Sequence, residues 1–118
     1  MRKIAVSFVV VSVLLLALPA MAQDPTEVDS KHYKVVFEND QVRVLRITYG
    51  PHEKSVMHEH PRNVAVFLTD QRVKFTFPDG TTEELVGKAG ETSWGKGKTH
   101  LPENLSDEPL ELILVELK

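Results

Sequence analysis

Three histidines carry the clearest chemical signal in this sequence. His58 and His60 stand two positions apart in the segment MHEHP, and His100 lies in the distant segment GKGKTHLPEN. Residues i and i+2 of a strand face the same side, so we expect the first two imidazoles to project together. Neutral imidazole nitrogens bind divalent ions at about 2.1 Å, which makes His100 the natural third ligand. On spacing alone, the alternative is that these are ordinary surface histidines near turns.

The remaining sequence predicts the strands that would position these side chains. Short apolar segments alternate with turn-forming residues, and all six glycines fall between those segments. No window after residue 22 combines sustained helical spacing with capping residues. This pattern is typical of an all-β sandwich or barrel. The expected strands are residues 33–37, 42–49, 64–69, 72–77, 81–86 and 110–117.

Two local patterns add detail to this prediction. The segment 72–77 (RVKFTF) alternates polar and apolar residues, which predicts a strand with one buried face. The PDG sequence at 78–80 favours a tight hairpin turn, because proline fixes its φ angle and glycine tolerates a positive one. At residues 44–45 the apolar alternation changes face, which predicts a β-bulge or burial on both sides of the strand.

Around the H-x-H pair the sequence resembles the first motif of the cupin superfamily, whose members are small double-stranded β-helix barrels. A glycine precedes H-x-H in that motif, and Gly50 takes this place with a longer spacer. The family's carboxylate ligand falls at residue 64 or 65, where this sequence has Val64 and Ala65. Neither side chain can bind a metal. The resemblance therefore implies at most three protein ligands, namely His58, His60 and His100.

The second cupin motif, P-x-G-x-x-H-x-x-x-N, is similar to residues 95–104. Gly97, His100 and Asn104 are all in register, and Gly95 replaces the proline. The resemblance covers roughly residues 33–117. It implies an all-β, single-domain cupin, in which a jelly-roll barrel encloses the metal.

A three-histidine site would have a distinct chemistry. Three neutral ligands leave a divalent ion with its full formal charge of +2 and with positions open for substrate and O₂ or water. Imidazole suits Fe, Mn, Ni, Cu and Zn, so we expect one divalent transition metal of unassigned identity. The resemblance implies that a catalytic version would be an O₂-dependent dioxygenase acting on a small anionic metabolite. Two alternatives stay open: a metal-free module that binds a small molecule or sugar, and a cupin isomerase or epimerase with a histidine base.

Five other residues need an interpretation. His52 precedes the first motif in a loop, where a solvated side chain is favoured over a fourth ligand. We expect Trp94 to pack in the core and Asn104 to hydrogen-bond backbone in a turn. Glu116 could supply an inward carboxylate, but its place near the chain end favours an exposed edge charge. We assign no role to His32.

The first 22 residues predict export. Arg2 and Lys3 precede an apolar run of about 15 residues, and Ala20-Met21-Ala22 supplies the small residues that a signal peptidase reads. A membrane-spanning helix needs roughly 20 apolar residues, so we expect no stable membrane anchor after processing. Residue 23 is Gln, so no cysteine is present there to accept a lipid. The protein is expected to be periplasmic or secreted.

After residue 22 we expect a flexible lead-in at 23–32 and a cupin domain at 33–118. Twelve basic side chains remain beside 17 acidic ones, which argues against nucleic acid as a partner. The sequence contains no cysteine, so stability must come from a core without disulfides. We expect a small-molecule ligand and a homodimer, because pairing would cover an exposed sheet edge or face.

Overall fold

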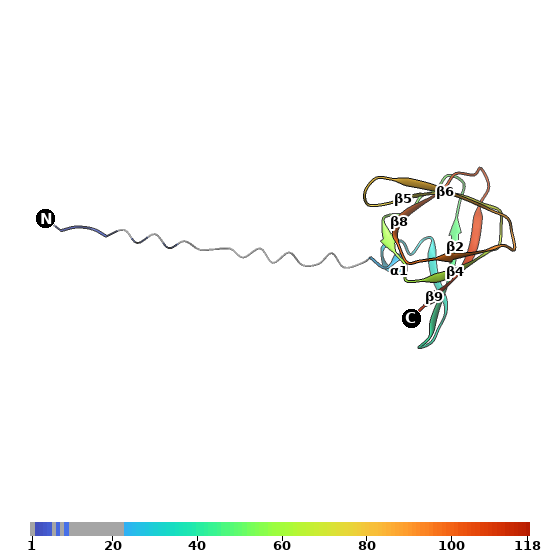
Figure 1. The fold of residues 1–118 in the computed structure, drawn as a ribbon, viewed down its shortest axis with the longest axis horizontal. Helices are drawn as coiled ribbons and strands as arrows, with labels where there is room; N and C mark the ends of the chain where they lie inside the picture. The colour runs from blue at the N-terminus through green and yellow to red at the C-terminus, as the bar shows by residue number, and fades with distance from the viewer. Residues whose placement is uncertain (1, 6, 8, 10–22) are drawn as a thin grey trace.

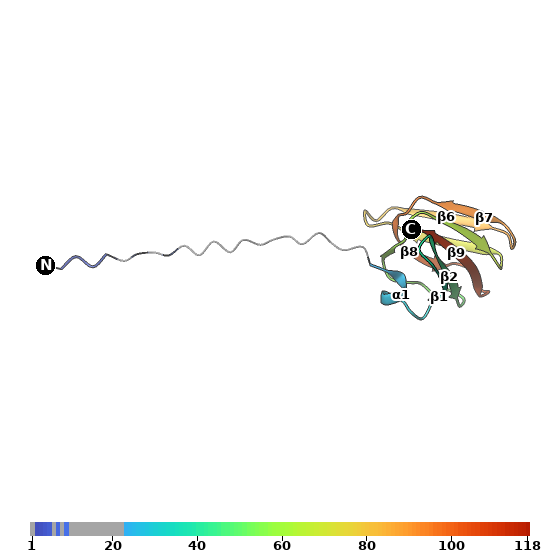
Figure 2. The same cartoon turned by 90° about the horizontal axis from the view of Figure 1, so that it is seen from below.

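The structure is a computed structural model that describes residues 2–5, 7, 9 and 23–118. Within these residues, one short helix precedes nine strands that form two facing sheets (Figures 1 and 2). The elements are α1 (Pro25–Val28), β1 (Tyr33–Glu38), β2 (Val42–Tyr49), β3 (His58–Glu59), β4 (Asn63–Phe67), β5 (Gln71–Thr76), β6 (Thr82–Gly87), β7 (Thr92–Gly95), β8 (Thr99–Asn104) and β9 (Leu110–Leu117).

The two sheets enclose the interior that holds the histidines. One sheet has the order β1-β2-β9-β4-β7, and the other has the order β3-β8-β5-β6. Every strand pair is antiparallel. The inward side chains are mostly apolar, and the core includes Leu45, Ile47, Phe67, Val73 and Leu114. The all-β, single-domain architecture is therefore as the sequence predicts.

The expected strands lie close to where the sequence places them. The 72–77 segment forms β5 and pairs with β6 through the predicted turn, where Gly80 has a φ of 85° and its N–H donates to the Phe77 carbonyl. The irregularity expected at residues 44–45 lies on the neighbouring strand instead. Val35 pairs with Leu45 and Phe37 with Val44, so Val36 is the extra residue of a bulge in β1. Strand β2 itself pairs with β9 without a break.

The segment 23–32 differs from the flexible lead-in that we expected. Asp24 caps α1 by accepting a hydrogen bond from the Thr26 N–H, and Pro25 in the first turn is buried. The Asp24 carboxylate also binds the guanidinium of Arg43 on β2 through two hydrogen bonds of 2.6 and 3.1 Å. A polar composition suggested a solvated segment, but these long-range pairs fasten it to the barrel. The predicted signal peptide, residues 1–22, lies mostly outside the described residues.

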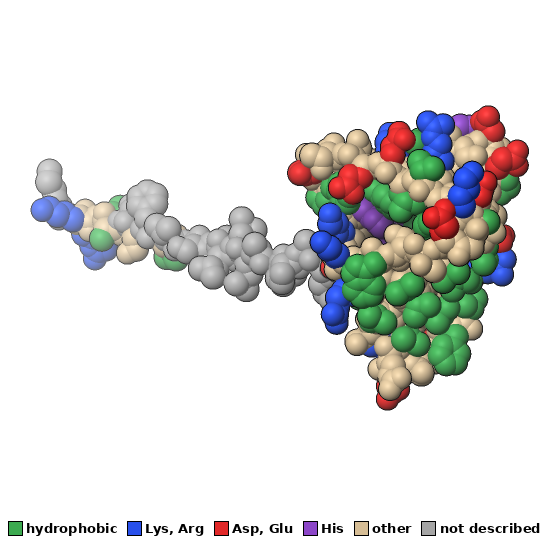
Figure 3. All heavy atoms as spheres, turned by 45° about the vertical axis from the view of Figure 1, so that its right-hand side comes forward, with side chains coloured by type: hydrophobic (Ala, Val, Ile, Leu, Met, Phe, Trp, Pro, Cys, Tyr) green, Lys and Arg blue, Asp and Glu red, His purple; other side chains and the backbone are tan. Residues whose placement is uncertain are grey.

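An apolar patch covers the outer face of the five-stranded sheet. One row crosses all five strands, because the strand registers align Phe37, Val44, Val115, Val64 and Trp94. Phe37 and Trp94, at the two edges, are 54% and 53% exposed. Figure 3 shows hydrophobic side chains gathered on this face. The prediction that Trp94 packs in the core is therefore wrong, since β7 turns its indole outward.

Among the described residues, we find no helix with the length and apolar character that a membrane crossing requires.

Candidate metal centre

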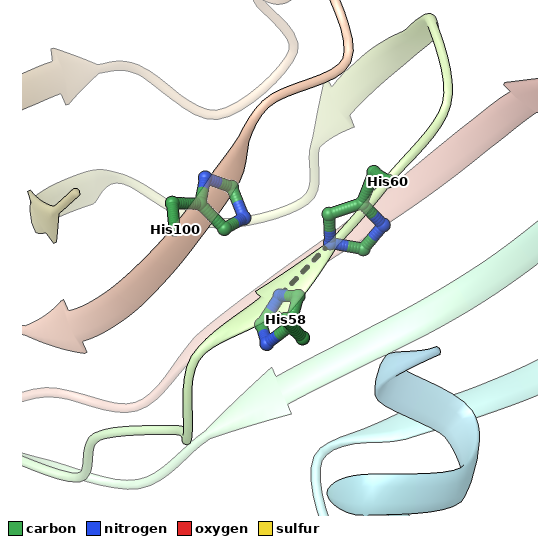
Figure 4. A group of neighbouring side chains, drawn as sticks. All are labelled: His58, His60 and His100. Carbon is green, nitrogen blue, oxygen red and sulfur yellow. Dashed lines mark hydrogen bonds between the residues drawn. The ribbon is translucent and has the colours of Figure 1, made fainter. Parts of the chain in front are cut away.

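The structure brings the three predicted histidines together. His58 on β3 and His100 on β8 are direct cross-strand partners, so their side chains share the inner face of the four-stranded sheet. His60 follows β3 and turns back toward the same point (Figure 4). His58 and His60 are 0% and 4% exposed, and His100 is half-buried. The alternative of surface histidines near turns is wrong for this trio.

The distances suit a shared ion. One ring nitrogen from each histidine lies within 4.8 Å of the other two, and the Nε2 atoms of His58 and His60 are 3.0 Å apart. Bonds of about 2.1 Å to one ion place ligand atoms roughly 3–4 Å from one another. Small side-chain rotations would therefore bring all three nitrogens to bonding distance. The identity of these ligands stays a prediction.

Hydrogen bonds on the far sides of two rings set their tautomers. The Nδ1–H of His58 donates to the Val56 carbonyl at 2.8 Å, and the Nδ1–H of His60 donates to the Glu116 carboxylate at 2.7 Å. When these imidazoles are neutral, each Nε2 then has no proton. In that state two Nε2 lone pairs face each other across 3.0 Å, and a cation bound by both nitrogens would stabilise the arrangement. The donor set therefore fits a metal ion.

His100 gives a second sign of a missing partner. Its Nε2 is buried without a hydrogen-bond partner, and it is the single side-chain atom in that state within the described part of the chain. Such an atom costs roughly 1–3 kcal/mol unless something satisfies it. Burial and the neighbouring His60 lower the pKa of His100 to about 3, and the same two causes lower that of His58 to about 4. Both rings are therefore neutral at pH 7, as metal ligation requires.

Glu116 is buried next to His60, on the side of the ring away from the other two histidines. The expectation of an exposed edge charge is therefore wrong. Glu116 is 2% exposed, and it accepts hydrogen bonds from His60 and from Arg43 Nε at 2.6 Å. Burial works to raise its pKa, but the hydrogen bonds from His60 and Arg43 outweigh that effect and lower it. A chain of contacts thus runs from His60 through Glu116 and Arg43 to Asp24. Period-two alternation along β9 was the available signal, because it places Glu116 on the same face as Leu114.

His58 has its own polar support, which the sequence did not reveal. The Ser55 hydroxyl lies 3.3 Å from His58 Nδ1 and donates to Asp29 at 2.5 Å. Asp29 also binds Nδ1 of His32 at 2.7 Å, and the His32 ring stacks on Tyr49 at 4.3 Å. His32 is 6% exposed, so it has a structural role that the sequence analysis did not assign. No single-residue pattern marks such a network, because its members meet only in the fold.

Glycine is required at one position of the second motif. Gly97 has a φ of 83°, and a Cβ there would lie 3.1 Å from the His60 carbonyl oxygen. The chain before β8 therefore passes directly over the His60 backbone. Asn104 is 1% exposed and hydrogen-bonds backbone groups of Gly50, Ser106 and Glu108, which confirms its structural role.

The side chains at the positions considered for a fourth ligand do not bind at this site. Ala65 faces the barrel interior but has no ligand atom, and Val64 lies on the outer face of β4. His52 is also no fourth ligand. Its side chain is 61% exposed and lies 2.6 Å from Asp107, away from the trio. Within the described residues, the group thus consists of three histidines alone.

The hydrogen bond from His60 to the Glu116 carboxylate leads to a prediction about metal affinity. We expect Glu116→Gln to weaken metal binding roughly 10- to 100-fold, because a carboxylate behind a ligating histidine orients the ring and raises its basicity. Competition titration against a chelator would measure the change. Glu111→Gln is the matched control, since Glu111 lies on the same strand but pairs with the half-exposed Arg46. Equal affinities for the two variants would contradict a supporting role for Glu116.

Comparisons with known proteins identify the fold. No protein-family model matches the sequence, and no curated protein matches it. Solved structures do match. A cupin domain from Bordetella pertussis Tohama I superposes with a TM-score of 0.67 at 23% identity, covering 73% of this chain and 91% of that one. The chain has the cupin fold.

Two more solved structures share this fold. An RmlC-like cupin family protein from Methanocaldococcus jannaschii has a TM-score of 0.58 at 15% identity, covering 72% and 77% of the two chains. The polyketide cyclase RemF from Streptomyces resistomycificus has a TM-score of 0.54 at 17% identity, covering 72% and 63%. The superpositions show the cupin fold, and at these low identities the activity has to be argued from the site.

Proposed function

We propose that this cupin binds one divalent transition metal through His58, His60 and His100. The observation that carries the proposal is the convergence of three imidazoles, with the Nε2 atoms of His58 and His60 3.0 Å apart beside the buried, unpartnered Nε2 of His100. A divalent ion at this point would act as a Lewis acid and hold substrate and O₂ or water together. An O₂-dependent dioxygenase is accordingly the first activity to assay.

The alternatives account less well for the same atoms. A metal-free binding module would leave the buried His100 nitrogen without a partner. An isomerase with a histidine base needs a pKa near the working pH, whereas burial lowers those of His58 and His100 to about 4 and 3.

Elemental analysis tests the proposal. The protein should be purified without a polyhistidine tag and measured beside a variant that lacks one of the three imidazoles. We expect close to one metal ion per chain, and loss of that ion in the variant. Absence of metal from the unaltered protein, together with no stabilisation by added Fe, Mn, Ni, Cu or Zn ions, would contradict the proposal and favour the metal-free module.

We also propose that the apolar patch on the five-stranded sheet pairs with a second copy of the chain. A two-fold axis along the central strand β9 would place Phe37 of one copy opposite Trp94 of the other. Charged groups on the same sheet are already paired, with Arg46 in the middle of β2 bound to Glu111 at 2.6 Å and Lys118 bound to Glu38 at 2.7 Å. These pairs would form a polar rim.

The size of the patch sets the expected strength of this dimer. Four strand spacings of about 4.8 Å make the patch roughly 19 Å wide. A stable interface buries roughly 800 Å² per partner, equal to a square of about 28 Å on a side, so the patch is small for a stable dimer. We therefore expect dimers that dissociate at micromolar concentration in light-scattering chromatography. Val115→Glu, at the centre of the patch, should give monomers throughout. Val86→Glu, on the other sheet, should dimerise as the unaltered protein does. If the unaltered protein were a monomer at every concentration, the proposed pairing would be contradicted.

A further inference from the structure

The barrel encloses a cavity whose lining is chemically uneven. The cavity has a volume of about 370 Å³, and His60 and His100 are part of its wall. A histidine is visible inside a hollow on the face drawn in Figure 3. This volume is near the lower end of the range of ligand pockets, roughly 300–1,000 Å³, which limits an occupant to a small molecule.

Away from the histidines the wall is apolar. Side chains from both sheets line it, including Ile47, Phe67, Val73, Leu85, Leu112 and Leu114. Burying the hydrocarbon part of a ligand against these groups is favourable, at about 25 cal/mol for each Å² of apolar surface removed from water. The apolar part of the cavity therefore fits a hydrocarbon body.

The amide nitrogens of the Gln and Asn side chains in this wall already donate hydrogen bonds to backbone carbonyls. The Gln71 amide nitrogen donates to the Thr69 and Glu111 carbonyls, and that of Asn104 donates to two backbone carbonyls. Asn63 donates to the Pro61 carbonyl at 2.9 Å. A sugar or polyol would bury several hydroxyl groups without partners here, at a cost of roughly 1–3 kcal/mol for each. This cost disfavours the sugar ligand considered from the sequence.

The charged side chains in the lining favour a ligand with a negatively charged group, which we call its head. Lys96 and Lys98 line the cavity beside one carboxylate, Glu83, and the Lys98 ammonium lies 5.1 Å from the centre of the Phe77 ring. A divalent ion held by three neutral imidazoles would add two further positive charges. Polar recognition is thus concentrated in the imidazoles and the lysines.

We propose that the cavity binds an organic monoanion with one polar head and an apolar body of one or two rings. The head lies at the histidines and the body fills the apolar part of the barrel. The position of the head rests on the proposed metal site, whereas the fit of the body rests on the apolar wall alone. The two parts can therefore be tested separately.

Calorimetric titration with 3-phenylpropionate, 3-phenylpropanamide and gluconate tests the proposal. We expect 3-phenylpropionate to bind at least tenfold more tightly than the uncharged amide, and gluconate to show no binding. Gluconate binding as tightly as 3-phenylpropionate would overturn the proposal, as would no binding of 3-phenylpropionate.

Repeating the titration after removal of metal separates this proposal from the proposed function. Retained but weaker binding of 3-phenylpropionate supports both. Equal binding in a protein that never holds metal would leave the apolar-anion site standing and the metal proposal rejected. Loss of all binding on metal removal would overturn the claim that the apolar wall itself selects the body.

Two neighbouring residues on β6 provide matched variants. Leu85 faces the cavity, whereas Val86 is 74% exposed. We expect Leu85→Gln to weaken binding of 3-phenylpropionate about tenfold or more, because the new amide disrupts the apolar wall. Val86→Gln should bind as the unaltered protein does. Because β6 is an edge strand, both variants are expected to fold, and circular dichroism would verify this. Unchanged affinity in Leu85→Gln would overturn the placement of the apolar body.

Discussion

Replacing His100 with alanine is expected to reduce the metal content of the protein from about one ion per chain to background. Structural zinc sites bind with roughly 10–16 kcal/mol, usually through four ligands, so one ligand contributes about 3 kcal/mol or more. The loss should therefore weaken affinity about 100- to 1,000-fold, which exceeds the effect expected for Glu116→Gln. Chelator competition and elemental analysis measure both effects on one scale.

The same substitution should leave the barrel folded. It removes a buried nitrogen that lacks a hydrogen-bond partner, although it also removes a ring stacked on Phe75 with centroids 4.8 Å apart. His52→Ala is the control, because that side chain is exposed and pairs with Asp107. If His100→Ala kept its metal, or if His52→Ala lost an equal amount, a different set of ligands would have to hold the ion.

The metal-free protein should lose stability in mild acid. The pKa of His58 is about 4 and that of His100 about 3 in the folded state, against 6.5 when unperturbed, because burial and neighbouring histidines oppose their charge. At a pH between the folded and the unperturbed pKa values, the unfolded chain binds more protons than the folded chain does. The free energy of unfolding is therefore highest above pH 6.5 and decreases as the pH falls. We expect a loss of about 2 to 4 kcal/mol between pH 7.5 and pH 5.

Urea unfolding at the two pH values, with chelator present, measures this loss. His100→Leu should lose about half as much, since one of the two responsible groups is gone. His52→Asn should behave as the unaltered protein. The lowered pKa values of Asp24 and Glu116 affect stability mainly below pH 4.5, so they contribute little in this range. An unchanged free energy of unfolding at pH 5 would show that the buried histidines are accessible to protons.

The sequence predicts the fold well where local pattern and packing agree. Strand β5 and its turn follow from a period of two and from PDG, because one face must be buried and glycine tolerates the positive φ. The β1 bulge is harder to predict from the sequence. The disturbed alternation appears in β2, whereas the extra residue, Val36, lies in β1. The alternation in a sequence indicates which residues change face, but it does not show which of two paired strands contains the extra residue.

For the candidate metal centre, the sequence could supply the three histidines but not their surroundings. His58 and His60 are linked by spacing, and the resemblance adds His100, whose cross-strand pairing with His58 the structure describes. Glu116 was misjudged because closeness to the chain end suggested exposure, whereas alternation along β9 turns it inward. Trp94 was misjudged for the converse reason, since aromatic character suggested burial while the outward face of β7 places the ring in solvent.

The fastening of Asp24 to Arg43 has a practical consequence for anyone preparing this protein. That aspartate lies two residues beyond the predicted cleavage point, and its guanidinium partner contacts the glutamate that holds an imidazole. The starting residue of a recombinant version is therefore part of the inner architecture. Trimming even a few amino acids there would remove one side of this partly buried ion pair.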